Sequence, residues 1–462
     1  MLRFWRECLA GILLFTFSWT AGATHFSRQT YPAELNTHLQ TITQEIHPAG
    51  SSANRRVGDY ILANIPEPYR VTVQEFTVSG KLLRNILAYH DRGFAETMLL
   101  STHYDSADNS YGAGDIGVGV ASSLSLLDEW AKMPLERNLL VAFVDGEEPM
   151  FDFEEGETSD HDHSIEDDLF EILLHGSRYF VRTYTGEFGR ISHIFNFEGR
   201  GTGGTNILFE SVNYSAQELA FLNERWPSWT FSLGEALYEV APNTTDVVMY
   251  REFEDAKILG FAIIGEVEHY HTSQDTFANV DEISKTTIYQ TMRRVVSTQI
   301  PANLSRIPVL YASVGSRMLV LPTLAVQILA VISGFYLLFQ TYRTRSWRFL
   351  PILVILGTFW WAEYSFVFLL SAVWFGLVYR YRRVLGRDFA PAIWLLGSGI
   401  VSYTQLVALA QYTGGLGGFL TYLPDALLFF LLQTPLGIIA FLGISLYVSI
   451  CLLRNTEQKA NV

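Results

Sequence analysis

The sequence predicts an α/β fold with a doubly wound, mostly parallel sheet, followed by an all-α transmembrane domain with several spans. Between residues 24 and 308, short apolar runs that suit buried strands alternate with stretches of helical periodicity. Several of these runs stop at polar side chains, and open α/β sheets bind their ligands at the carboxyl ends of their strands. From Leu319 onward, almost every window is apolar and aromatic, which indicates membrane spans.

The clearest strand is the run from Asn138 to Val144, which is apolar after its first residue and therefore suits a strand buried on both faces. Asp145 and Gly146 then turn the chain, and Glu147 and Glu148 follow. Adjacent like charges in a cleft repel each other and need a cation, so the pair favours a metal site with one ligand and one group free to move protons. Two surface acids on a solvated loop are the alternative, and only further ligands can decide.

Other predicted elements also end in polar residues. Strands are expected at residues 85–89, 97–102, 191–197 and 261–267, and a Gly-rich turn from Tyr111 to Gly119 leads into a helix through Trp130. Five potential metal ligands stand near these ends: His103, Asp115, Glu148, Glu198 and His271. Each alone would more often be an ordinary surface or core residue. Their shared placement predicts a pair of zinc ions with one bridging carboxylate and a water molecule between them.

Eight motifs follow one another between His47 and Thr276: HPAGSSANRRVGDYI, LLSTHYDS, GAGDIGVGVA, FVDGEE, LLHGSRYF, NFEGRGTGG, PNTTD and YHTSQDT. In these motifs the chain resembles the co-catalytic di-zinc aminopeptidase family, which also contains glutaminyl cyclases and the transferrin-receptor ectodomain. With the apolar tail, the resemblance is greatest to the membrane-anchored endoplasmic-reticulum and vacuolar metallopeptidase branch. For the tail, this resemblance holds only in outline.

The resemblance implies a role for each residue of the site. His103 and Glu198 would bind one zinc ion, Glu148 and His271 the other, and Asp115 would bridge the two. Glu147 would be the general base, which agrees with the ability of an unligated carboxylate to accept a proton from a metal-activated water.

Three neighbours of these residues complete the expected site. Tyr270, beside His271, would steady the oxyanion, and Asp105, two residues after His103, would accept a hydrogen bond from that imidazole. The family usually has Asp or Asn after the bridging Asp, where this chain has Ile116.

An acidic insertion, about residues 149–170, separates FVDGEE from LLHGSRYF, two motifs that are nearly contiguous in typical members of the family. It contains His161 and His163, so a calcium or other metal site is conceivable, but the spacing matches no standard ligand loop. A solvated, mobile insertion is the favoured interpretation, and such a segment could cover or restrict the cleft.

The composition and the terminal segments limit the possible partners and the location of the protein. A net charge of −15 argues against a nucleic-acid partner. Residues 1–23 combine Arg3 and Arg6 with an apolar run, so a cleaved signal peptide and an uncleaved anchor both remain open, and either exports the domain at 24–308. The two cysteines, Cys8 and Cys451, lie in apolar end segments and predict no disulfide in the exported domain.

The range 309–462 is predicted to be the helical transmembrane domain. Leu319–Gln340, Phe389–Tyr412 and Thr434–Leu453 are each long enough to cross a bilayer. The segment 349–379 is long for one span and short for two. Arginine clusters flank it on both sides, so the positive-inside rule predicts that it enters and returns as a hairpin near Glu363.

The sequence thus predicts a membrane-tethered zinc aminopeptidase that faces the periplasm or an equivalent lumen and hydrolyses amino-terminal residues from peptides. Its expected partners are peptides and membrane lipid, and no oligomeric state is predicted. A glutaminyl-cyclase-like transferase and a catalytically inactive binding protein on the same scaffold remain alternatives. The intact Glu147–Glu148 pair disfavours the first, and the complete ligand set disfavours the second.

Overall fold

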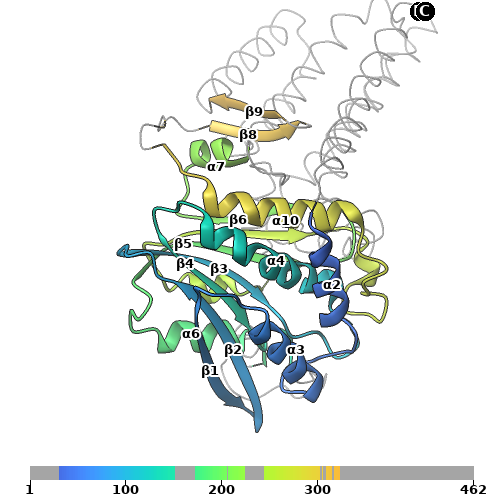
Figure 1. Ribbon diagram of the computed structural model, residues 1–462. Coiled ribbons are helices and arrows are strands. Elements are labelled where there is room, and N and C mark those ends of the chain that lie inside the picture. Colours follow the sequence, from blue (N-terminus) through green and yellow to red (C-terminus); the bar gives the residue numbers. More distant parts are fainter. Residues whose placement is uncertain are drawn as a thin grey trace, which may run out of the picture.

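Seven strands pair into one sheet in the order β1-β2-β4-β3-β5-β7-β6, with helices on both faces (Figure 1). The computed structural model describes residues 31–150, 172–204, 206–223, 244–301, 304, 309–314 and 317–322. The strands of the sheet are β1 (Arg70–Val78), β2 (Lys81–His90), β3 (Glu96–His103), β4 (Asn138–Val144), β5 (Arg190–Gly199), β6 (Asn206–Val212) and β7 (Lys257–Ile263).

The centre of the sheet is parallel and its edges are antiparallel. β4, β3, β5 and β7 run parallel to one another, whereas β1 pairs antiparallel with β2, β2 with β4, and β6 with β7. The β1–β2 turn consists of Ser79 and Gly80, whose φ values of 46° and 79° suit a two-residue hairpin turn. The predicted mostly parallel sheet is therefore confirmed at its centre, and the sheet as a whole is mixed.

Two hydrophobic cores lie on opposite faces of the sheet. Along β4, Leu139, Val141 and Phe143 enter the core beneath α2, α3, α4 and α10, and the alternate residues enter the core beneath α6 and α9. All seven residues of β4 are buried, as its continuous apolar run predicts. The described helices are α2 (Ala33–Ile42), α3 (Ser52–Ala63), α4 (Val118–Lys132), α6 (His175–Thr183), α7 (Ala216–Asn223), α9 (Val247–Tyr250) and α10 (Glu282–Ser297).

A side chain caps the N-terminus of α3. The side chain of Ser51 accepts a hydrogen bond from the backbone N–H of Asn54 and caps α3.

The strand predicted at residues 261–267 is β7, which begins earlier and ends at Ile263. It cannot extend to Val267 because Glu266 has a φ of 51°, which is incompatible with a strand.

A second, two-stranded sheet follows the domain, formed by β8 (Val309–Val314) and β9 (Arg317–Pro322). These residues were expected to begin the helical membrane domain, with a first span from Leu319, and the hairpin corrects that expectation for residues 309–314 and 317–322. The physical reason is two β-prone runs separated by only Gly315 and Ser316, which is a hairpin pattern.

Among the helices that the structure describes, none has the length and apolar character needed to cross a bilayer. The predicted spans from residue 323 onward and the N-terminal segment 1–23 lie outside the described residues. So does the acidic insertion from residue 151.

Phe143 provides a test of the core that supports β4. Its side chain is fully buried, so Phe143→Ala should lower the free energy of unfolding by about 3–5 kcal/mol. Val71→Ala is the control, because Val71 is 39% exposed on the edge strand β1, and it should change that energy by no more than about 0.5 kcal/mol. Denaturant unfolding followed by tryptophan fluorescence measures both, and equal midpoints for the two variants would contradict this packing.

Candidate metal centre

The parallel centre of the sheet brings the predicted ligands to one edge, because parallel strands present their carboxyl ends on the same side. His103 is the last residue of β3, Glu148 follows β4, and Glu198 is the penultimate residue of β5. Asp115 lies in a short turn of π-helix, η1 (Ala113–Gly117), before α4, and His271 follows a 3₁₀ turn, η2 (Val267–His269), after β7.

These five side chains form one continuous series of contacts. Glu198 Oε2 lies 3.5 Å from His103 Nε2, which lies 3.6 Å from Asp115 Oδ1. The other carboxylate oxygen, Asp115 Oδ2, lies 3.2 Å from His271 Nε2, and that nitrogen lies 2.9 Å from Glu148 Oε1. Asp115 is therefore the central member of the series and directs one oxygen to each half.

The spacing suits metal ligands. Two atoms that each lie about 2.1 Å from a tetrahedral ion are about 3.4 Å apart, close to the separations around His103. The potential ligand atoms of His103, Asp115 and Glu148 all lie within 4.8 Å of one another. His103 Nε2 and Asp115 Oδ2 are buried without a hydrogen-bond partner among the described residues, as expected of atoms that a cation would bind.

Local hydrogen bonds orient two of these ligands. His103 Nδ1 lies 3.1 Å from the backbone carbonyl of Asp105. Because a carbonyl can only accept, Nδ1 carries a proton, and Nε2 is the nitrogen that faces Asp115 and Glu198 and could bind an ion. On β5, the Asn196 side chain donates a 2.7 Å hydrogen bond to Glu198 Oε1, which leaves Oε2 to face His103.

The centre is buried on most sides. His103, Asp115, Glu148 and Glu198 are all at most 4% exposed, whereas the side chain of His271 is 35% exposed. The site is therefore open to solvent on the side of His271.

Buried like charges dominate the electrostatics. Burial and the charge of Asp115 raise the pKa of Glu148 to about 7. Burial lowers the pKa of His271, but contacts with Asp115 and Glu148 outweigh it and raise the pKa to about 10. The carboxylates thus favour the protonated form of the imidazole. A divalent cation would supply the same positive charge, because metal ions displace protons from such ligands.

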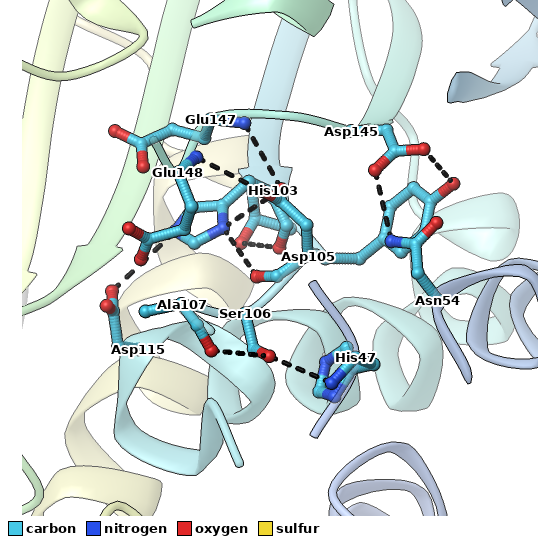
Figure 2. Close-up of polar contacts among 12 residues, drawn as sticks. His47, Asn54, His103, Asp105, Ser106, Ala107, Asp115, Asp145, Glu147 and Glu148 are labelled. Carbon is cyan, nitrogen blue, oxygen red and sulfur yellow. Dashed lines mark hydrogen bonds and ion pairs between the residues drawn. The ribbon is translucent and has the colours of Figure 1, made fainter. Parts of the chain in front are cut away.

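Asp105 connects the ends of β3 and β4. Figure 2 shows the backbone N–H groups of Glu147 and Glu148 directed at its carboxylate, at 3.2 and 3.1 Å. Asp105 also lies against the His103 imidazole, as expected, with its backbone carbonyl 3.1 Å and its carboxylate 3.5 Å from Nδ1. The carboxylate mainly fixes the turn that presents the two glutamates.

Glu147 differs from Glu148 in its surroundings. The Glu148 carboxylate contacts His271, whereas no described residue forms a hydrogen bond or ion pair with the Glu147 carboxylate. Burial and then the charge of Glu198 raise the pKa of Glu147 well above its ordinary value.

Asp145 anchors the turn from the other side. Its carboxylate accepts hydrogen bonds from the Asn54 side chain at 3.0 Å, the Arg84 backbone N–H at 2.9 Å and the Tyr104 hydroxyl at 3.1 Å. Gly146 follows with a φ of 78°, a conformation that favours glycine. The sequence correctly predicted a turn here, but not these long-range partners.

Asp275 is a supporting residue that the sequence analysis missed. It is fully buried, and its carboxylate accepts hydrogen bonds from the backbone N–H groups of Gly114 at 2.5 Å and Asp115 at 3.3 Å, and from the Ser110 hydroxyl at 3.1 Å. It thereby joins the segment that carries His271 to the turn that carries Asp115. Its place four residues after His271, in the motif YHTSQDT, was the available signal.

Tyr270 and Ile116 lie beside the ligands. The Tyr270 ring stacks on the His271 ring, with centroids 3.8 Å apart. Ile116, where the family usually has a polar residue, is buried in the core beneath α2 and α4, so it supports the Asp115 turn by packing.

Comparisons with known proteins agree with the motifs. The family model "Peptidase family M28" matches residues 85–296. A vacuolar membrane protease of Eremothecium gossypii is 28% identical over 323 residues, which cover 60% of this chain and 29% of that protein. A second, from Lodderomyces elongisporus, is 29% identical over 272 residues, which cover 53% of this chain and 25% of that protein. The chain therefore spans less than a third of the length of these curated relatives.

Among solved structures, a leucine aminopeptidase precursor from Bacteroides thetaiotaomicron is 17% identical with a TM-score of 0.45, over 59% of this chain and 100% of that one. The predicted family resemblance is confirmed by the match to the family model, which includes His103, Asp115, Glu148, Glu198 and His271. Residues 85–296 of the chain are therefore similar to peptidase family M28.

Proposed function

We propose that the chain is a membrane-tethered zinc aminopeptidase. The observation that carries the proposal is the contact series from Glu198 through His103, Asp115 and His271 to Glu148, with one Asp115 oxygen directed to each half. This arrangement matches a dinuclear site in which one carboxylate bridges two ions. Similarity to a peptidase family supports peptides as the substrates.

The residues divide into two ligand groups. His103 and Glu198 would hold one zinc ion, His271 and Glu148 would hold the other, and Asp115 would contribute to both. Bound zinc would polarise the scissile carbonyl and lower the pKa of a water molecule at the site. Asp105 and Asp275 keep the ligand-bearing turns in place through backbone hydrogen bonds.

Glu147 is the general base. Its backbone is fixed by Asp105, but its carboxylate has no described partner, so the group is positioned yet free to accept a proton from the attacking water and return it to the leaving amine. Tyr270 stands next to a metal ligand on the open side of the site, where its hydroxyl would donate a hydrogen bond to the developing oxyanion.

The apolar tail tethers the domain to a membrane, with the active site on the periplasmic or luminal side. The composition of residues 323–462 and the arginine clusters around 349–379 support this placement. The relatives named vacuolar membrane proteases support a membrane location as well.

The two adjacent glutamates should fail in different ways when substituted. Glu147→Gln keeps the size of the side chain but removes the base, so this variant should retain both zinc ions and lose about 10²- to 10⁴-fold in turnover. Glu148→Gln removes a charged ligand, so zinc content and turnover should both fall, and added zinc should partly restore them. Metal content by mass spectrometry, together with turnover on one amino-acid amide, reports both quantities. If Glu147→Gln loses zinc while Glu148→Gln retains it, the two roles are reversed.

The reaction itself can be distinguished by its products. With peptides that begin in glutamine, an aminopeptidase releases free glutamine and exposes a new amino terminus, whereas a glutaminyl cyclase releases ammonia and leaves the peptide bond intact. We expect new amino termini from these peptides and from a panel of other dipeptides. Ammonia release without new amino termini would favour the cyclase, and a zinc-replete chain that turns over neither class would be a binding protein.

The topology of the tail can be tested with reporter fusions at Tyr342, Arg387, Asp425 and Val462. If the arginine clusters are cytoplasmic, the fusions at Tyr342, Arg387 and Val462 should report the cytoplasm and that at Asp425 the exported side. An exported signal at Arg387 would show that the segment 349–379 crosses the membrane once.

A further inference from the structure

Arg200 is a cation at the edge of the metal centre that the proposed mechanism does not use. It directly follows β5, two residues after Glu198, and its backbone N–H donates a 2.8 Å hydrogen bond to the carbonyl of Ile263 at the end of β7. The main chain of Arg200 is therefore fixed at the same strand edge as the ligands. Its side chain is half-buried.

The guanidinium lies on the open side of the site. Its central carbon is 5.6 Å from the centre of the Tyr270 ring, and Tyr270 in turn stacks on His271, the most exposed ligand. One guanidinium nitrogen donates a weak 3.5 Å hydrogen bond to the backbone carbonyl of Thr244. Arginine has five N–H donors, and among the residues that the structure describes no carboxylate lies within ion-pair distance of this group.

The carboxylates of the metal centre are the negative charges that act on Arg200. Asp115, Glu147 and Glu198 are close enough to interact with its guanidinium electrostatically, and among the described residues its direct contacts are the Thr244 carbonyl and the Tyr270 ring. Divalent ions at the site would neutralise much of this negative charge, so in a loaded site the guanidinium could attract a further anion.

We propose that Arg200 binds a carboxylate of the substrate and so makes the enzyme prefer peptides that place a carboxylate close to the scissile bond. This inference rests on the proposed peptidase function. The planar guanidinium matches a carboxylate with two parallel hydrogen bonds, and the open side of the site is where a peptide would enter. The carboxylate is the carboxyl terminus of a dipeptide or the side chain of an acidic residue.

The contact with Tyr270 alone does not account for this residue. The central carbon of the guanidinium lies 5.6 Å from the ring centre, and the Thr244 carbonyl accepts from one nitrogen, so other N–H donors of this group can bind an acceptor. Arg200 can therefore hold the Tyr270–His271 stack and bind a carboxylate at the same time.

Binding to the zinc-loaded full chain tests the proposal directly. In a Glu147→Gln background, which should bind peptides without cleaving them, calorimetry compares Leu-Gly with Leu-Gly amide, and Leu-Asp amide with Leu-Asn amide. In at least one pair, the carboxylate should increase affinity by about 10- to 100-fold. The first pair reports the main-chain terminus and the second the acidic side chain.

Variants of Arg200 assign the preference to the guanidinium. Arg200→Met should abolish the affinity ratio within the responsive pair, and Arg200→Lys should retain part of it because the charge remains while the planar fork is lost. Arg190→Met is the matched control, since Arg190 lies at the opposite end of the same strand, in an ion pair with Glu96. Zinc content and affinity for Leu-Gly amide show that each variant is folded.

The outcomes separate this inference from the proposed function. A ratio near one in both pairs for the parent protein, or a ratio unchanged in Arg200→Met, would overturn the role of Arg200 even if the wild-type chain cleaves peptides. An Arg200-dependent ratio supports the role even if the wild-type chain fails to cleave them, in which case the proposed peptidase function is the part that is wrong.

Discussion

Repulsion among buried carboxylates is the constraint on which the rest of the site depends. Asp115, Glu148 and Glu198 are each at most 4% exposed and lie in one series of contacts with only two imidazoles between them. Buried carboxylates so close together are unfavourable unless protons or a metal ion bring positive charge. This repulsion occurs at the carboxyl ends of the parallel strands, where the surrounding strands are closely packed.

Two buried aspartates let the fold hold this arrangement. Asp105 ties the end of β3 to the turn after β4, and Asp275 ties the segment after β7 to the turn that carries Asp115. The end of β5 is held by close packing instead, because a Cβ at Gly199 would lie only 1.9 Å from the carbonyl oxygen of Gly114. The ends of β3, β4, β5 and β7 and the η1 turn are thus fixed to one another. Because Asp105 and Asp275 hold the backbone of these segments, substitution of either aspartate would displace more than one ligand.

Patterns local in the sequence were predicted well, and long-range features were not. The run from Asn138 to Val144 is apolar at nearly every position, so its burial on two faces could be predicted, and the polar residues after each strand could be expected to meet at one edge. The hydrogen bonds that Gly114 donates to Asp275 and Asn54 donates to Asp145 join residues far apart in the chain, and no local pattern reveals them. The hairpin at 309–322 was missed because apolar strands and the start of a membrane span have the same composition, and only length separates them.

The predicted ligands differ in solvent exposure, which indicates the side from which the site is accessible. His103, Glu198 and Glu148 are enclosed by the sheet and its turns, whereas His271 is the one predicted ligand with a substantially exposed side chain. In the proposed mechanism, a peptide would approach from the side of His271, and Glu147 would act from the turn after β4. Arg200 lies over the Tyr270 ring of the Tyr270–His271 stack, so the charge preference proposed for it would act next to the most exposed of the predicted ligands. In the proposed mechanism, residues after β5 and β7, such as Arg200 and Tyr270, would select the substrate, and Glu147 in the turn after β4 would transfer the proton.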